Sequence, residues 1–210
     1  MGLVPQRFSP FAPLNISEPR AWFLDFRLAA LKQDRALCAA VLRAPAIEAS
    51  AVEDQPYKDG CGWKNAVKIA TAGGARVGAE PVTCETAAAF AMWFNGAVQT
   101  AALKHFGKRV RSIQHLGTYS CRNIVGNKLW QDFRSQHATA NAIDIASLTL
   151  DDGRTISVKK DWSGATEESA FLRDIHAEAC HFFRVALGPG YNAAHADHFH
   201  LDRGFLKTCR

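Results

Sequence analysis

The sequence predicts an α+β fold in which an antiparallel β-sheet is covered by helices on one face. Apolar residues recur at helical spacing over about 85–105 and again over about 167–187. Between these segments, 143–150 and 155–158 are rich in apolar and β-branched residues and flank a strong hairpin-turn signal, Asp151-Asp152-Gly153. A chain of 210 residues, 48% hydrophobic and 21% charged, has the size and composition of one globular domain.

The N-terminal part is expected to form an irregular arm over 1–16, followed by a single domain over 17–210. Ser17 is a candidate helix cap with Pro19 in the first turn. An apolar stripe that follows predicts one or two helices reaching about residue 43. The region 44–82 is rich in glycine, proline and short polar residues, and only 66–70 suggests a strand there.

The rest of the chain gives clearer signals. Thr83 is expected to cap the helix over 85–105, and Gly107 to end it. A strand is predicted over 110–116, followed by a polar turn and then by the hairpin strands. Gly188-Pro189-Gly190 stops the helix predicted over 167–187, and a final strand carries the residues from His198 to Asp202.

Charge and cysteine content limit the class of protein. The net charge of +5 and pI near 9.0 favour an anionic partner such as nucleic acid, anionic lipid or an acidic cell-wall polymer. Six widely spaced cysteines, with no CxxC pair, indicate three disulfides formed in an oxidising compartment; the sequence allows fifteen pairings. Buried free thiols are the alternative.

The beginning of the chain does not resemble a signal peptide, because its apolar residues are interrupted by prolines. No apolar run is long enough to span a membrane, so no transmembrane segment is predicted. If the cysteines are oxidised, the protein is expected to be periplasmic or otherwise exported, with a signal or anchor removed from this chain.

Two separated segments carry a candidate metal site. One holds His137 and Asp144, and the other holds His198 and His200. In a β-strand alternate side chains share a face, so both histidines of the second segment would face a cleft on the sheet while Phe199 enters the core. The small residues over 138–142 permit a tight reversal that returns Asp144 toward His137.

Catalytic zinc has three protein ligands and keeps one position open. His137, Asp144 and His200 are therefore predicted to bind about one Zn²⁺ per chain, with His198 as a free neighbour. The plainer interpretation is a metal-free, hydrogen-bonded cluster.

The motifs resemble those of a known group of enzymes. Ser135-x-His137-x-x-Ala140-x-Ala142-x-Asp144 is similar to the SxHxxGxAxD signature of D-alanyl-D-alanine carboxypeptidases and related peptidoglycan metallopeptidases. His195-x-x-His198-x-His200 resembles the second zinc motif of penicillin-insensitive murein endopeptidases. From about residue 34 to 210, the chain resembles the extensin-like C-terminal domain family of bacterial proteins.

The resemblance implies roles for individual residues. It implies the same three zinc ligands, a catalytic role for His198 and a contact between Arg122 and a substrate carboxylate or oxyanion. Ser135 and His195 are further candidates for binding substrate. Asp197 is a rival catalytic base, although strand alternation is expected to point it away from the cleft.

The family pattern is not matched at every position. Ala140 stands where the motif usually has glycine, which puts the turn between His137 and Asp144 in question.

The predicted function is therefore zinc-dependent hydrolysis of amide bonds in the stem or cross-link peptides of peptidoglycan. Carboxypeptidase and endopeptidase action both stay open, as does the oligomeric state. The alternative is a non-catalytic wall-binding module on the same zinc scaffold. Nucleic acid is not an expected partner, because no dense run of basic residues accompanies the positive charge.

Overall fold

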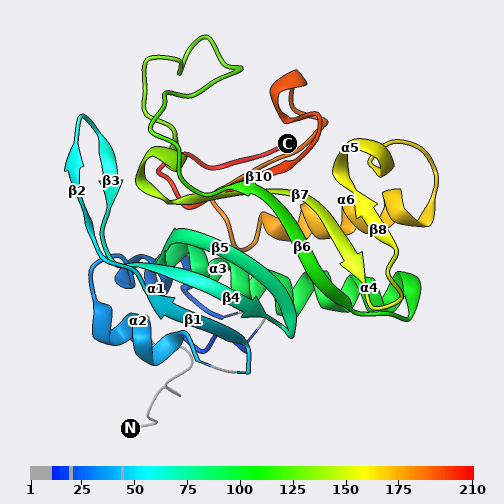
Figure 1. The fold of residues 1–210 in the computed structure, drawn as a ribbon, viewed down its shortest axis with the longest axis horizontal. Coiled ribbons are helices and arrows are strands. Elements are labelled where there is room, and N and C mark those ends of the chain that lie inside the picture. Colours follow the sequence, from blue (N-terminus) through cyan, green and yellow to red (C-terminus); the bar gives the residue numbers. More distant parts are fainter. Residues whose placement is uncertain (1–10, 19–20, 44) are drawn as a thin grey trace, which may run out of the picture.

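The computed structural model describes residues 11–18, 21–43 and 45–210 and has the predicted α+β architecture (Figure 1). In these residues, nine strands form the main sheet and two more form a separate hairpin. The helices are α1 (Leu24–Ala30), α2 (Arg35–Val41), α3 (Cys84–Trp93), the π-helix η2 (Phe94–Val98), α4 (Gln99–Phe106), the 3₁₀-helix η3 (Gln136–Thr139), α5 (Val158–Asp161), α6 (Glu167–Ala179) and the 3₁₀-helix η4 (Ala193–His195). The strands are β1 (Ile47–Ala51), β2 (Gln55–Lys58), β3 (Cys61–Trp63), β4 (Ala66–Ala72), β5 (Ala75–Thr83), β6 (Val110–Gly117), β7 (Ala142–Leu150), β8 (Thr155–Ser157), β9 (Val185–Leu187), β10 (Phe199–Asp202) and β11 (Thr208–Cys209).

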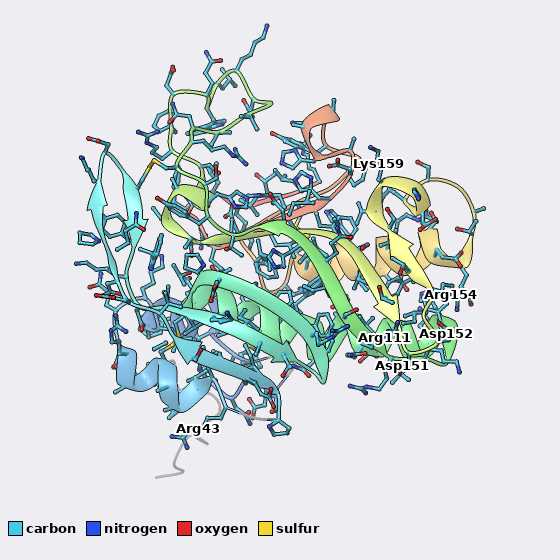
Figure 2. The ribbon with its side chains drawn as sticks, in the orientation of Figure 1. Arg43, Arg111, Asp151, Asp152, Arg154 and Lys159 are labelled. Carbon is cyan, nitrogen blue, oxygen red and sulfur yellow. A yellow bond between two sulfur atoms is a disulfide. The ribbon has the colours of Figure 1, made fainter. Side chains whose placement is uncertain are left out.

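The main sheet has the order β1-β4-β5-β6-β7-β10-β9-β11, and β8 pairs with β7. Its neighbours are antiparallel except for two parallel pairs, β5 with β6 and β9 with β11. The predicted hairpin is confirmed: Asp151, Asp152 and Arg154 lie at the turn between β7 and β8 (Figure 2). In the part of the chain that is described, no helix has both the length and the apolarity to cross a membrane.

The predicted helix over 85–105 is confirmed as α3, η2 and α4, which run without a break from residue 84 to residue 106. Gly107 ends it in the left-handed conformation, with φ of 61°. Thr83 precedes it as expected, but its hydroxyl does not cap the helix and is hydrogen-bonded to Thr86 and Asn141 instead. This links the start of α3 to the turn before β7.

The helix predicted over 167–187 is too long. α6 ends at Ala179, and Val185–Leu187 form β9, an inner strand that pairs with β10 and β11. The three apolar residues of β9 are compatible with either a helix or a buried strand. They form a strand because they pair with β10 and β11.

The N-terminal helices differ from the prediction in where they begin. Ser17 lies in a turn and caps no helix, and Pro19 lies outside the described residues. Two separate helices, α1 and α2, do precede residue 43, and Asp34 caps α2 by accepting a hydrogen bond from the backbone N–H of Leu37. Residues 11–16 contain no helix or strand, although Leu14 and Ile16 are buried in the core.

The region 44–82, where only one strand is suggested by the residue pattern, contains the first four strands and most of β5. The strand suggested over 66–70 is confirmed within β4. β1, β2 and β3 are short, and all four residues of β2 are exposed, so no alternation of apolar side chains marks that strand. β5 is longer, and buried and exposed residues alternate along most of its length.

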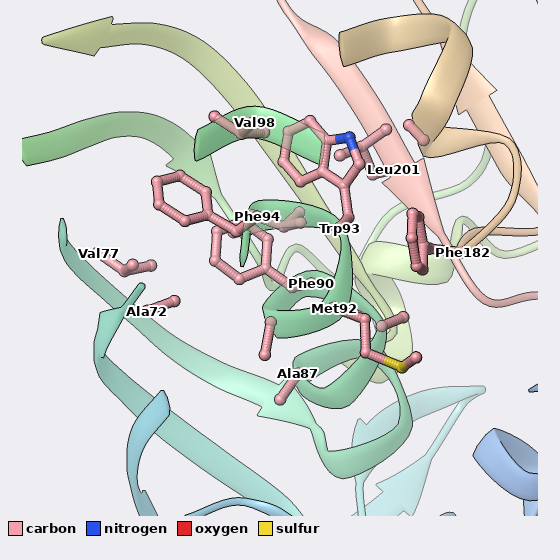
Figure 3. Packing of buried hydrophobic residues seen from close by; sticks show 14 of the residues in the cluster. Ala72, Val77, Ala87, Phe90, Met92, Trp93, Phe94, Val98, Phe182 and Leu201 are labelled. Atoms are coloured by element: carbon pink, nitrogen blue, oxygen red, sulfur yellow. The ribbon is translucent and has the colours of Figure 1, made fainter. Parts of the chain in front are cut away.

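The core lies between the sheet and the helices that pack on it. Phe90, Trp93 and Phe94 project from the helix between β5 and β6, with Val77 on one side and Leu201 of β10 on the other (Figure 3). The Trp93 indole N–H donates a hydrogen bond to the carbonyl of Ile175 in α6, 2.8 Å away. The central helix therefore joins both halves of the sheet to α6.

Three disulfides are formed, and the described residues contain no free cysteine. Cys38–Cys84 joins α2 to α3, Cys61–Cys121 joins β3 to the loop after β6, and Cys180–Cys209 joins the end of α6 to β11. The predicted number of disulfides is confirmed, and three disulfides in a chain of this size fit an oxidising environment.

A buried ion-pair network holds α1, α3 and the end of β10 together. The guanidinium of Arg203 contacts the carboxylate of Glu85, with Nη2 and Oε1 3.0 Å apart, and both side chains are 1% exposed. Arg203 also contacts Asp25 of α1 at 2.6 Å and donates to the carbonyl of Phe182 at 3.0 Å.

Replacing Glu85 with alanine is expected to lower the free energy of unfolding by about 3–5 kcal/mol, because it leaves a buried guanidinium without one of its two carboxylate partners. Denaturant unfolding of the oxidised protein would measure this. The matched control is Glu168→Ala, which breaks the exposed ion pair with Arg154 and should cost less than about 1 kcal/mol. Equal losses in the two variants would show that the buried network does not stabilise the fold.

Candidate metal centre

Three side chains from three elements meet at the centre of the sheet. His137 lies on η3, Asp144 on β7 and His200 on β10. β7 and β10 are antiparallel neighbours, and their register places Asp144 directly opposite His200. The chain reverses between η3 and β7 at Ala140, whose φ of 53° lies in the left-handed region. Alanine therefore keeps the turn for which the related motif uses glycine.

The donor atoms of this cluster lie close enough to share one ion. His137 Nε2 is 3.1 Å from His200 Nδ1 and 3.1 Å from Asp144 Oδ2, and His200 Nδ1 is 3.0 Å from Asp144 Oδ1. Two ligands at about 2.0–2.1 Å from a tetrahedral zinc are about 3.3 Å apart, a separation close to that of the two ring nitrogens. Each ring nitrogen contacts a different oxygen of Asp144, and one donor atom from each of the three residues lies within 4.8 Å of the others. The exposed fractions of the three residues are between 3% and 9%.

Hydrogen bonds to neighbouring groups orient the imidazoles of His137 and His200. Nδ1 of His137 donates to the carbonyl of Thr118 at 3.2 Å, and Nε2 of His200 donates to Oδ2 of Asp202 at 2.9 Å. A carbonyl or a carboxylate only accepts hydrogen bonds, so each ring carries its proton on the nitrogen that points away from the cluster. The other nitrogen of each ring is left to bind a cation, as in metal sites where an outer partner fixes the histidine tautomer.

The pKa values of Asp144 and His200 are shifted by burial and by their mutual contacts. Burial alone would raise the pKa of Asp144, but its contacts with the His137 and His200 imidazoles outweigh it and hold the pKa well below its usual range. Burial alone would lower the pKa of His200, but hydrogen bonds to Asp144 and Asp202 raise it to about 9. Near neutral pH, a proton on His200 therefore takes the place that a metal ion would hold.

Zinc binding is consequently expected to depend on pH. Below about pH 9 zinc must displace the proton from His200, so the affinity should fall about tenfold per pH unit from this residue alone. Competition with a chromophoric chelator, corrected for protonation of the chelator, would measure it. A constant affinity between about pH 6 and pH 8 would contradict the proton competition.

Replacing Asp202 with alanine is expected to weaken zinc binding by about 10–100-fold, because His200 loses the acceptor that orients its ring. The same chelator competition at one pH would measure it. Asp132→Ala, at an exposed position in the loop between β6 and β7, is the control and should leave the affinity unchanged. Loss of affinity in both variants, or in neither, would contradict an orienting role for Asp202.

His198 lies beside the three candidate ligands and is oriented by Asp197. Its Nε2 is 3.7 Å from Asp144 Oδ1, and its Nδ1 donates to Asp197 Oδ1 at 2.8 Å. The expectation that Asp197 points away from His198 is wrong, because β10 begins only at Phe199 and strand alternation does not extend back to these residues. The hydrogen bond from His198 lowers the pKa of Asp197, which keeps this half-exposed carboxylate charged.

His195 stands next to His198 and His200, with ring centroids 5.3 and 5.8 Å away. Its Nδ1 lies 2.8 Å from Oδ1 of Asn192, whose amide group is fixed by a bond from Nδ2 to the carbonyl of Gly126. Burial, together with the charges of His200 and His198, lowers the pKa of His195 to about 4. This imidazole is therefore neutral near neutral pH.

A cavity of about 310 Å³ opens next to the cluster. His195, His198 and His200 form part of its wall, as do Arg122 and Ser135. Within the described residues Arg122 makes no ion pair, and its guanidinium donates only to the neighbouring carbonyl of Asn123 at 3.3 Å. Ser135 caps η3, where its hydroxyl accepts a hydrogen bond from the backbone N–H of His137.

The β2–β3 hairpin is attached to the segment that carries Arg122. The disulfide Cys61–Cys121 ends one residue before Arg122, and the ring of Trp63 packs edge-on against Tyr119 with centroids 4.8 Å apart. Nε of Arg134 donates to the carbonyl of Asp59 in the hairpin turn. The hairpin thus supports the wall of the cavity from outside.

Three groups that position the candidate ligands or His195 were assigned no role from the sequence: the Asp202 carboxylate, the Thr118 carbonyl and the Asn192 amide. Asp202 had a visible signal, since it follows His200 by two residues and so shares a strand face with it. Thr118 contributes its backbone carbonyl and Asn192 lies in a loop, so the identity of neither residue indicates this role in the sequence.

Comparison with known proteins gives one match. A family model described as extensin-like protein C-terminus matches residues 36–210, which include every residue of the cluster and of the cavity wall named above. No curated protein and no solved structure matches the chain.

Proposed function

We propose that this chain, which belongs to the extensin-like protein C-terminus family, is a zinc-dependent peptidase that hydrolyses amide bonds in peptidoglycan stem or cross-link peptides. The observation that carries the proposal is the convergence of His137, Asp144 and His200 beside a cavity. His200 and His198 lie in the wall of that cavity, and His198 is oriented by Asp197. Three ligands leave one coordination position for water or substrate, which distinguishes catalytic from structural zinc sites.

The donor set suits the chemistry. Two neutral imidazoles and one carboxylate would leave a zinc centre with a net charge of about +1. A zinc ion held by these residues would act as a Lewis acid: it would polarise the substrate carbonyl and lower the pKa of its bound water to about 7. The chain itself provides the ligands and the groups that orient them.

His198 is the proposed proton acceptor. Its Nδ1 is bonded to Asp197, so in the neutral ring Nε2 is bare and faces the cluster beside Asp144. A proton taken by Nε2 from the attacking water would be stabilised by the Asp197 carboxylate and could pass to the leaving amine. In this proposal Asp197 is a positioning residue and not the base.

Arg122, Ser135 and His195 are the proposed substrate contacts. A guanidinium with no carboxylate partner among the described residues can bind a carboxylate of a peptide substrate or an oxyanion. His195 is neutral and can exchange a hydrogen bond with the peptide without adding charge. Peptidoglycan is also consistent with the net charge of +5, since its peptides carry free carboxylates.

Periplasmic or otherwise exported location is part of the same proposal. Disulfides persist in oxidising compartments, where peptidoglycan is also found, and this chain has three of them.

The decisive test is incubation of the zinc-loaded protein with cross-linked muropeptides, followed by chromatography and mass spectrometry. Products that have gained one water and a new amino terminus support the peptidase, and their masses distinguish endopeptidase from carboxypeptidase action. Protein stripped of zinc is the control. Retention of muropeptides without new termini would instead establish a non-catalytic wall-binding module, and neither cleavage nor retention would overturn the proposal.

A further inference from the structure

Five apolar side chains, which we call the ledge, lie in or next to the wall of the cavity. They are Val125, Leu129, Trp130, Phe133 and Phe205. Four of them are 52–86% exposed, with Leu129 the most exposed. The ring of Trp130 lies between those of Phe133 and Phe205, with centroids 5.2 and 6.2 Å away. An apolar group of this kind on a surface marks an interaction site.

The ledge is a fixed part of the molecule. The loop between β6 and β7 that carries most of it is closed by a hydrogen bond from the N–H of Ile124 to the carbonyl of Phe133, at 2.9 Å. Asn127 donates to the hydroxyl of Tyr191 at 3.0 Å, which ties the loop to the segment before η4. A Cβ at Gly126 would lie 2.9 Å from Cβ of Ala194, so the two segments are in close contact. In Figure 1 both segments project on the same side of the molecule as the β2–β3 hairpin.

The ledge is continuous with the candidate metal centre. Val125, Trp130 and Phe205 line the same cavity as His198 and His200. A ligand that places an amide at His198 and extends out of the cavity on this side must cross the ledge. A lipid bilayer seated on these side chains would instead cover the entrance, so continuity favours a partner that is attached to the substrate.

Polar side chains surround the apolar ones. Lys128, Gln131 and Asp132 are exposed on the same loop, and Asn127 and Tyr191 line the cavity. This mixture fits a saccharide, whose ring has an apolar C–H face that can lie on an aromatic side chain and hydroxyl or N-acetyl groups at its edge. A hydrocarbon chain would use none of the polar groups.

We propose that the ledge binds the N-acetylated sugar strand to which the substrate peptide is attached. This deepens the proposed function and rests on it for the identity of the substrate. The protein then acts on peptides that still carry their glycan, and the ledge aligns the strand while the peptide enters the cavity.

The test measures binding of a short oligomer of N-acetylglucosamine to the zinc-loaded protein by calorimetry. This probe has no stem peptide, so its binding requires no turnover, and failure of the peptidase proposal would leave the result unchanged. The wild type should bind it, and Trp130→Ala and Phe205→Ala should each weaken binding about tenfold. Trp130→Phe keeps an aromatic ring and should retain most of the affinity.

Tyr57→Ala is the matched control, because Tyr57 is a 54% exposed aromatic residue on β2 and is not part of the ledge. It should bind the sugar like the wild type. No sugar binding by the wild type, or equal binding by Trp130→Ala, would overturn the proposal. Binding to vesicles of anionic phospholipid that is lost in Trp130→Ala, without sugar binding, would also overturn it and assign the ledge to a membrane surface.

Discussion

Replacing His137 with alanine is expected to reduce bound zinc from about one ion per chain to none after dialysis. The imidazole supplies one of only three protein ligands, and its tautomer is already set for metal binding by the Thr118 carbonyl. The remaining pair, Asp144 and His200, would keep their direct contact at 3.0 Å and share a proton instead. Elemental analysis of the purified variant would measure the metal content.

The control for this change is His181→Ala, which removes an exposed histidine that follows α6 and does not belong to the cluster. It should bind zinc like the wild type. A wild-type protein that contains no zinc and gains no stability when zinc is added would contradict both the peptidase and the binding-module interpretations.

Replacing His198 with alanine is expected to lower kcat by about 10²–10⁴-fold while zinc content stays at the wild-type level. His198 lies outside the set of three donors that can hold the ion, so its loss removes the proposed proton acceptor and leaves the ligands in place. Turnover of cross-linked muropeptides and elemental analysis of the same preparation would give both numbers.

Asp197→Asn tests the positioning role in the same assay. An amide oxygen can still accept the hydrogen bond from Nδ1 of His198, but it lacks the charge that stabilises a protonated ring. We expect kcat to fall less than in His198→Ala and the pH profile to shift, with little change in KM. If Asp197→Asn were as inactive as His198→Ala with an unshifted profile, Asp197 would be the better candidate for the base.

The β10 segment illustrates what local pattern can predict. Phe199 and Leu201 are fully buried while His200 and Asp202 share the opposite side, as alternation along a strand requires. The pattern failed two residues before the strand, at Asp197, which does not take part in the strand pairing. Strand alternation therefore predicted the side-chain directions correctly within β10, but not in the residues that precede it.

The secondary-structure errors have a similar origin. Val185–Leu187 follow a long helix and were assigned to it, although only pairing with β10 and β11 makes them a strand. The strands over 47–63 were missed because they are short and more than half of their residues are exposed. Pairing with strands distant in the sequence stabilises β1 and β9, whereas β2 and β3 pair with each other in a local hairpin.

By itself, the sequence determined which side chains were able to form a metal centre, because residue chemistry and strand alternation are local properties. It also favoured three disulfides over free thiols, and the structure supplied the pairing. Only the tertiary structure decided that Asp144 lies opposite His200, that the Thr118 carbonyl and Asp202 orient the two rings, and that an apolar cavity wall stands beside them. The physical reason is that these contacts join segments up to 63 residues apart, and their register depends on how the whole sheet packs against its helices.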